Sequence, residues 1–234
     1  MSRYLATELR ASGLRLPPIT VANMGVDMER FVPGDREAAR ARLRLAPSGP
    51  IVLAVGGLTP RKNPLVLLQA FARVREARPD ARLVFVGDGP LRGPVAVGAE
   101  QRGLASAVTL TGRVPHGEVA EWMGACDLLG LPSLVEPLGI VALEALASGR
   151  PVVATRIGGV SEVVPVPRAG AVADPRNPSD IAGAILRTLA APPTPEACRA
   201  AAEPNDVRRQ AARVADALLS ARDRAGSPAG VATI

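Results

Sequence analysis

The chain has 234 residues, long enough for one large domain or two small ones with a substantial core. Hydrophobic residues make up 47% of it and aromatic residues only 2%, so the core must consist mainly of Ala, Val and Leu, which suits parallel strands covered by helices. The net charge is +6, but the arginines are scattered, without a basic run or many aromatic residues for base stacking. This composition argues against nucleic-acid binding and favours attraction to anionic substrates or surfaces.

Short apolar runs alternate with amphipathic stretches along the chain. The predicted strands are Ile19–Ala22, Ile51–Val55, Arg82–Val86, Val108–Leu110, Leu128–Leu131, Pro151–Ala154 and Ala171–Ala173. The predicted helices are Arg3–Ser12, Arg36–Leu43, Pro64–Ala77, Val95–Arg102, Gly117–Ala125, Ile140–Ala147, Pro178–Ala190 and Asp206–Ala225. This alternation predicts an α/β fold, specifically a Rossmann-like doubly wound parallel sheet.

Prolines mark several of the predicted boundaries. The pairs Asn63-Pro64 and Asn177-Pro178 place proline at the first position of a helix. The proline-rich stretch Ala191–Pro204 predicts an irregular connection. The first part of the chain, up to the strand at Ile51, holds too few elements for a domain of its own and is interpreted as the end of another domain. The predicted organisation is a domain remnant at 1–22, a connection at 23–50, a ligand-binding domain at 51–190, a linker and C-terminal helix at 191–225, and a disordered tail at 226–234.

The compartment is inferred from the apparent lack of a targeting signal and from the use of cysteine. The first residues, MSRYLATELRASG, lack the apolar core of a signal peptide, and no run is long enough to span a bilayer. Cys126 and Cys198 lie far apart and in no metal-like spacing, which fits free, buried thiols in a reducing compartment. We therefore expect a soluble, cytoplasmic protein whose association with membranes is at most peripheral.

Two glutamates, Glu136 and Glu144, stand out in the stretch LPSLVEPLGIVALEALASGRPVVAT. Glu144 is the only charge in the run from Gly139 to Ser148, and an ionised carboxylate in a buried helix is costly unless it has a partner or a ligand. Glu136 lies in a turn, bounded by Pro and Gly, between a predicted strand and that helix. A strand, a tight loop and a helix N-terminus form a standard anion-binding corner. Taken alone, the two acids could be an acid/base pair or two ligand contacts.

A second signal is the segment VGGLTPRKN, which directly follows the first strand of the main sheet. Gly56 and Gly57 let the backbone come close to a ligand. The basic pair Arg61 and Lys62 stands beside the start of the next helix, and Lys62 is the only lysine in the chain. The same residues could also form a solvated basic turn.

Two further loops follow strands. VGDGP lacks the spacing of a dinucleotide-binding fingerprint, and its simplest interpretation is a turn. TGRVPHGEV contains the only histidine, His116, which is interpreted as a loop or capping residue rather than a catalyst. Because all four loops follow strands of a parallel sheet, they should meet at one edge, where such sheets bind ligands. The expected ligand is anionic and bears a sugar, whose vicinal hydroxyls suit a carboxylate such as Glu144.

These motifs together resemble the C-terminal, donor-binding half of retaining glycosyltransferases of the GT-B fold, in the GT4 family. The resemblance rests on the E-x7-E motif from Glu136 to Glu144 with its flanks, on NMGVDMERFVPG as the segment entering the second domain, and on VGGLTPRKN as the phosphate-binding loop. It covers roughly Ser2 to Ala190, with a weaker match through Leu219. It implies that the N-terminal, acceptor-binding domain is largely absent and that residues 1–22 are the end of it.

The resemblance implies a site for a nucleotide-sugar donor, whose glycosyl group moves with retention to an acceptor that the sequence does not identify. Glu144 would accept hydrogen bonds from the ribose hydroxyls, and Glu136 would hold the transferred sugar. Lys62 and Arg61 would contact the diphosphate, where positive charge lowers the barrier to its departure. The remaining donor contacts would come from Gly56, Gly57, Arg113, Val114, Leu138 and Gly139.

One absent motif and one departure from the family pattern, besides the missing N-terminal domain, bear on the site. The sequence has no D-x-D motif, so we expect no metal and no cofactor beyond the donor itself. Many family members carry Arg directly after the first glycine of the phosphate loop, where this chain has Gly57, and Arg61 is a candidate to replace that side chain.

Three interpretations stay open at this stage. The chain could be a glycosyltransferase domain that needs a separate acceptor-binding domain or subunit. It could instead be a nucleotide-sugar-binding or interaction module without catalysis. A nicotinamide-dependent dehydrogenase is disfavoured because the dinucleotide fingerprint is absent.

Overall fold

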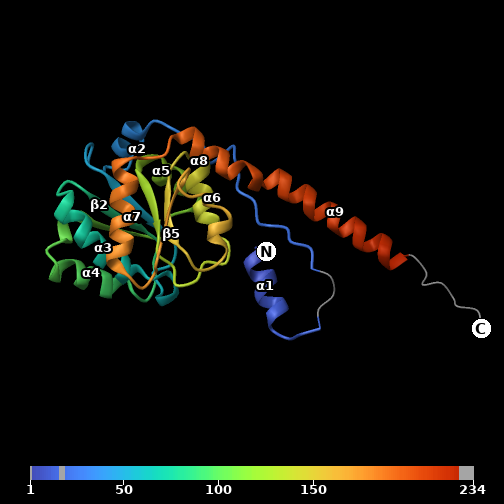
Figure 1. The fold of residues 1–234 in the computed structure, drawn as a ribbon. Coiled ribbons are helices and arrows are strands. Elements are labelled where there is room, and N and C mark those ends of the chain that lie inside the picture. The colour runs from blue at the N-terminus through green and yellow to red at the C-terminus, as the bar shows by residue number, and fades with distance from the viewer. Residues whose placement is uncertain (1, 16–18, 227–234) are drawn as a thin grey trace, which may run out of the picture.

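The computed structural model describes residues 2–15 and 19–226, which form an α/β structure around one sheet of six parallel strands (Figure 1). The strands follow the order β3-β2-β1-β4-β5-β6 across the sheet. Their bounds are β1 Ile51–Val55, β2 Arg82–Val86, β3 Val108–Gly112, β4 Leu128–Leu131, β5 Val152–Thr155 and β6 Gly170–Ala173. The order reverses between β1 and β4, which confirms the predicted doubly wound sheet and places its switch point there.

Helices cover both faces of the sheet (Figure 1). One face carries α3 (Pro64–Ala77), α4 (Arg92–Gln101) and α7 (Pro178–Ala190). The other carries α2 (Arg36–Arg42), α5 (His116–Ala125), α6 (Ile140–Ala147) and α8 (Pro195–Ala202). Alternate strand residues supply the two cores: Leu53 packs with the α6 side, and its neighbour Val52 packs with the α3 side. Burial on both faces explains why the strands are almost wholly apolar.

Asparagine and proline define the helix starts as predicted. Pro64 is the first residue of α3, and Asn63 before it adopts a left-handed conformation with φ 57°. The Asn63 side-chain amide donates to the carbonyl oxygens of Pro132 and Pro175, at 3.2 and 2.6 Å, which ties three loops of the carboxyl edge together. Asn177 caps α7 by accepting from the backbone amides of its first turn.

Two predicted elements were wrong. Residues 19–22 form no strand, and the residues that directly follow them bond to the start of α9 (Val207–Gly226) and the turn before it instead of to a sheet edge. The backbone amide of Asn23 donates to the side chain of Gln210, and that of Val26 to the carbonyl of Asn205. The stretch 191–204, predicted to be irregular, contains α8, because Pro195 sits at the first helical position and Thr194 caps that turn.

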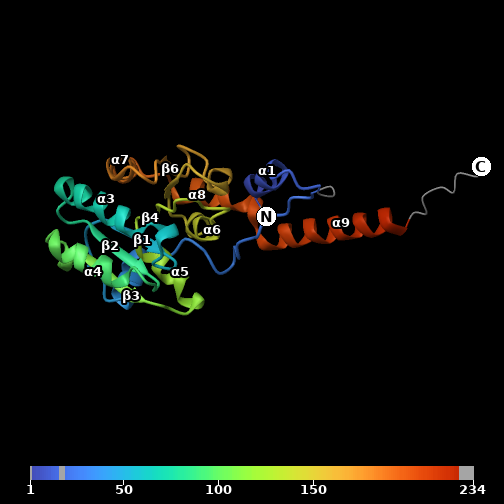
Figure 2. The same ribbon diagram turned by 90° about the horizontal axis from the view of Figure 1, so that it is seen from below.

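Helices α1 (Arg3–Ala11) and α9 lie outside the two layers, and α9 projects away from the sheet (Figures 1 and 2). The backbone amides of Arg3 and Tyr4 donate to the carboxylate of Glu162, at 3.0 and 2.7 Å, so this side chain holds the start of α1 against the domain. The tail was predicted at 226–234; its first residue, Gly226, instead ends α9, and 227–234 lie outside the described residues. Within the described part of the chain, no helix is both long and apolar enough to cross a membrane.

Both cysteines are buried and free, as predicted. Burial raises the pKa of the Cys126 thiol to about 12 and that of Cys198 to about 11. These thiols therefore stay protonated at neutral pH and contribute to packing rather than to chemistry.

Candidate functional site

An open cavity of about 470 Å³ lies at the carboxyl edge of the sheet, beside the switch point between β1 and β4. Its walls come from the loop after β1, the loop between β4 and α6, the starts of α5 and α6, and α1. The lining residues are Ser2, Leu5, Met24, Val55, Gly56, Arg61, Lys62, His116, Val119, Glu136, Pro137, Leu138, Gly139, Ile140, Val141 and Glu144. The cavity therefore lies where doubly wound sheets bind their ligands.

Glu136 is buried in the floor of this cavity and paired with the chain's only lysine. Its Oε2 atom accepts hydrogen bonds from Lys62 Nζ at 2.6 Å and from Ser133 Oγ at 3.0 Å. The backbone of Glu136 is also fixed, because its carbonyl accepts from the amide of Gly159 at 2.8 Å. Side chain and backbone are thus both held, and the carboxylate is presented in one defined place.

The N-terminus of α6 opens onto the cavity next to Glu136. Gly139 precedes the helix in a left-handed conformation, with φ 81°, and no side chain caps the first turn. A Cβ atom there would lie 3.1 Å from a methyl group of Val160 and 3.3 Å from Cγ of Glu136, so glycine fits both the conformation and the space. The uncapped helix end directs its amides and its dipole at the cavity, which favours an anionic ligand.

Glu144 lies farther along α6 with a different partner. Its Oε1 atom is 2.9 Å from Nε2 of His116, the first residue of α5. Burial raises the pKa of Glu144, and the hydrogen bond from His116 opposes that shift. Glu136 and Glu144 each have their own nitrogen partner, so they do not share a proton as a coupled pair of acids would.

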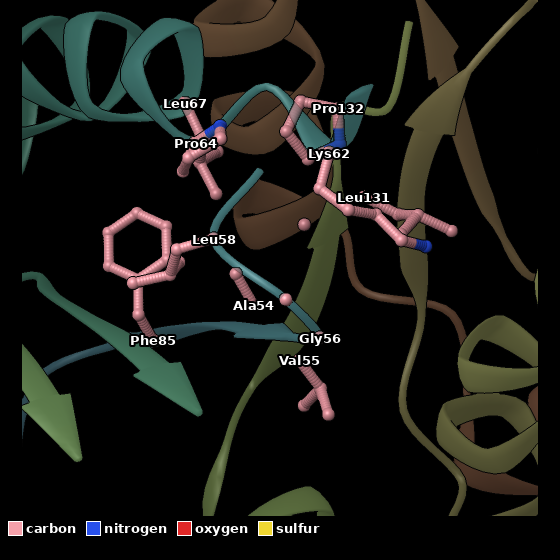
Figure 3. A pocket seen from close by; sticks show the side chains of 12 residues that line it. Ala54, Val55, Gly56, Leu58, Lys62, Pro64, Leu67, Phe85, Leu131 and Pro132 are labelled. Carbon is pink, nitrogen blue, oxygen red and sulfur yellow. The ribbon is translucent and has the colours of Figure 1, made fainter. Parts of the chain in front are cut away.

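The loop after β1 brings positive charge to the rim. Residues Pro60–Lys62 form a short 3-10 helix that places Arg61 and Lys62 at the cavity. Within the described residues, Arg61 forms no salt bridge, whereas Lys62 is committed to Glu136. Beneath this loop is a small apolar pocket of about 20 Å³, with Gly56 and Lys62 at its edge (Figure 3).

The structure thus gathers Gly56, Arg61, Lys62, Glu136, Leu138, Gly139 and Glu144 around one cavity. Three other predicted contacts are placed elsewhere. Gly57 lines the small apolar pocket, and Arg113 and Val114 lie in the loop between β3 and α5 without lining the large cavity.

The VGDGP loop acts as a packing turn, as its simplest interpretation predicts. A Cβ atom on Gly87 would lie 2.0 Å from the carbonyl oxygen of Gly56, and one on Gly89 would lie 2.6 Å from that of Leu58. These glycines let the second loop pack directly on the first. The loop therefore supports the site from outside it.

Sequence reasoning missed two polar residues of the site. His116 was interpreted as a loop or capping residue, yet it contacts Glu144, and Ser133 was not considered, yet it binds Glu136. Only the position of Ser133, three residues before Glu136, offered a signal.

No group of three or more His, Cys, Asp or Glu side chains that could hold a metal ion occurs among the residues that the structure describes.

Fold and cavity together define a Rossmann-like α/β domain whose open cavity suits an anionic ligand. The family model for glycosyl transferases group 1 matches residues 35–205, and the chain belongs to that family. The family inferred from the sequence motifs is therefore confirmed.

Individual relatives agree with this assignment. The chain is 40% identical over 178 residues to a D-inositol 3-phosphate glycosyltransferase of Segniliparus rotundus, covering 74% of this chain and 40% of the relative. Among solved structures, sucrose-phosphate synthase of Thermosynechococcus elongatus matches with a TM-score of 0.78 at 28% identity, over 97% of this chain and 58% of that one. HepE of Anabaena, solved in complex with UDP, matches with a TM-score of 0.83 at 25% identity, over 94% of this chain and 62% of that one. The chain thus spans about half the length of such relatives.

Proposed function

We propose that this domain binds a nucleoside-diphosphate sugar and takes part in transferring the glycosyl group to an acceptor, with retention at the anomeric carbon. The observation that carries the proposal is the composition of one cavity. It combines a lysine–carboxylate pair, an uncapped helix N-terminus and a second buried carboxylate at the switch point of the sheet. Family membership supports the same reaction class.

Each group has a role that follows from its chemistry. Departure of the nucleoside diphosphate is the difficult event, and Lys62, Arg61 and the N-terminus of α6 supply the positive potential that stabilises its leaving oxygen. Glu136 lies between Lys62 and the helix start and holds the transferred sugar. Glu144 accepts hydrogen bonds from the ribose hydroxyls. Because protein groups supply the charge, we expect donor binding to survive removal of divalent metals.

UDP is the nucleotide we propose first, because one of the matching structures holds it. The acceptor is not specified by any residue in this cavity. An acceptor-binding domain or subunit has to form the opposite wall of the cleft, since the chain corresponds to about half of its relatives.

A second candidate is a nucleotide-sugar-binding module without catalysis, since no residue that lines the described cavity specifies an acceptor. Both candidates require donor binding, and only the first requires transfer. Titration calorimetry with UDP- and GDP-sugars, with and without EDTA, tests the donor binding that both candidates require.

Glu144→Ala should weaken donor binding by about 1–3 kcal/mol, the usual loss for a hydrogen bond to a charged group. Glu118→Ala, at an exposed position in the first turn of α5, is the matched control and should bind as the wild type does. Wild-type affinity in Glu144→Ala would contradict the ribose role. Absence of binding by the unmodified chain would contradict the proposed function itself.

A further inference from the structure

His116 is a polar residue of the cavity to which the proposed function gives no role. It is the first residue of α5, and its imidazole lies edge-on to the ring of Phe31, with 5.9 Å between centroids. Its Nε2 atom is 2.9 Å from Oε1 of Glu144, and its Nδ1 atom is 3.4 Å from Nη1 of Arg30. The imidazole therefore links an arginine of the connection before α2 to a buried carboxylate of α6.

The direction of both hydrogen bonds follows from the arginine. A guanidinium group can only donate, so Nδ1 of His116 must accept from Arg30. A neutral imidazole that accepts at Nδ1 carries its proton on Nε2, and that proton points at Glu144. Arg30 thus selects the tautomer that can donate to the carboxylate.

Glu144 needs such a donor more than an exposed glutamate would. Burial raises its pKa and so favours the protonated form, which is a poorer acceptor for sugar hydroxyls. The hydrogen bond from His116 counteracts this and holds one carboxylate oxygen in place. The other charged groups of the cavity, Lys62, Arg61 and Glu136, lie on the loops after β1 and β4, and Lys62 is already paired.

We propose that His116 is a positioning residue that, with its tautomer set by Arg30, keeps Glu144 ionised and oriented toward the ribose of the donor. The contact itself stands on the geometry alone, and its effect on donor binding rests on the proposed function. The two parts can be tested separately.

Nitrogen-15 NMR tests the contact without any ligand. Because His116 is the only histidine, a long-range proton–nitrogen spectrum of the labelled chain shows a single imidazole. The expected result above pH 7 is the tautomer protonated at Nε2, with the Nδ1-protonated form gaining population in Arg30→Ala. A ring protonated at Nδ1 in the unmodified chain would overturn the proposal.

Calorimetry with UDP and 2′-deoxy-UDP, repeated with GDP and its 2′-deoxy analogue, tests the effect on the ribose. His116→Ala should weaken binding of the ribonucleotide about tenfold, as expected when a hydrogen bond to a charged group is lost, and should reduce the preference over the deoxy analogue. This loss should grow as the pH falls, because Glu144 then becomes protonated more readily.

Two variants separate positioning from loss of structure. His116→Gln retains an amide donor and should recover most of the affinity, while Glu118→Gln, in the same helical turn, should change nothing. Equal affinity and equal ribose preference in His116→Ala and wild type would overturn the proposal. If the unmodified chain binds neither nucleotide, the proposed function fails, and the tautomer still decides whether His116 donates to Glu144.

Discussion

Glu136 and Glu144 show how position decides the role of two identical side chains. Glu136 sits before α6, where a lysine, a serine and the helix start surround it. Glu144 sits within the helix, where its hydrogen-bond partner is the imidazole of His116. The first carboxylate is therefore paired with an ammonium group, whereas burial raises the pKa of the second.

This difference predicts that the ionised side chain of Glu144 lowers the free energy of unfolding at neutral pH. Its pKa is raised above 4.5 in the folded chain, so folding favours the protonated form. That preference stabilises the protein below pH 4.5 and is lost as the pH rises through the folded-state value. Glu144→Gln, which keeps the shape and removes the charge, should therefore melt at a higher temperature than wild type at pH 7.

The decisive measurement is how the difference in melting temperature between Glu144→Gln and wild type changes with pH. Thermal melts of both proteins should converge as the pH falls toward 4.5, because Glu144 of the folded wild type takes up its proton above that pH. Glu118→Gln removes an exposed charge and provides the control at each pH. A Glu144→Gln protein less stable than wild type at pH 7 would refute this account.

Arg61 gives a second prediction at this scale. The side chain is exposed at the rim and has no salt-bridge partner among the described residues, so its charge is free to meet a diphosphate. Arg61→Ala should weaken UDP binding by about 1 kcal/mol, more at low salt, because exposed charges act through solvent. Calorimetry at two salt concentrations checks this, with Arg73→Ala on the outer side of α3 as the control. Unchanged affinity would remove Arg61 from the site.

Residue types and local spacing were sufficient to single out several residues that the structure brings to one cavity. Glu136 and Lys62 stood out because each is unusual in its own sequence surroundings, and they form an ion pair. The contacts themselves could not be predicted, since Lys62 and Glu136 lie 74 positions apart and His116 and Glu144 lie 28 positions apart. The second contact depends on how α5 and α6 pack, which no local pattern specifies.

At the scale of elements, the start of α6 depends on one glycine. Gly139 has φ 81°, a conformation that costs other residues roughly 1–2 kcal/mol. Gly139→Ala should lower stability by at least that amount, because the added Cβ also meets Val160, and it should weaken donor binding by tilting the helix start. Urea unfolding and calorimetry measure the two effects.

Gly93→Ala is the matched control for this substitution. Gly93 lies in α4, and a Cβ atom there would meet nothing within 4 Å. Alanine at that helical position should be neutral or slightly stabilising. Equal behaviour of the two alanine variants would show that the conformation of Gly139 is not important for the fold or the site.

Most elements could be predicted because they carry strong local signals. The bounds of β1, β2, β4, α3, α6 and α7 agree with the prediction, since apolar runs and Asn-Pro boundaries define them. The strand predicted at 19–22 failed because a strand requires a partner that local sequence does not reveal. Helix α8 was missed because its prolines were interpreted as breaks, whereas Pro195 begins the helix.

For the whole molecule, the open cavity predicts binding without efficient turnover. One wall can hold a donor, but it neither orients an acceptor nor excludes water. The isolated chain should therefore bind UDP-glucose and show little or no glycosyl transfer, and addition of an acceptor-binding domain should restore transfer. Product analysis with and without that domain measures this, and efficient transfer by the purified chain alone would disprove it.

The pairing of Lys62 with Glu136 has a consequence for chemical modification. Because Lys62 is the only lysine, the chain has a single side-chain amine, and it lies inside the proposed donor site. Acetylation of that amine would remove the cation and also leave the Glu136 carboxylate without its counter-ion. One acyl group would thus change two charge interactions at once, and no other lysine exists to share or mask the effect.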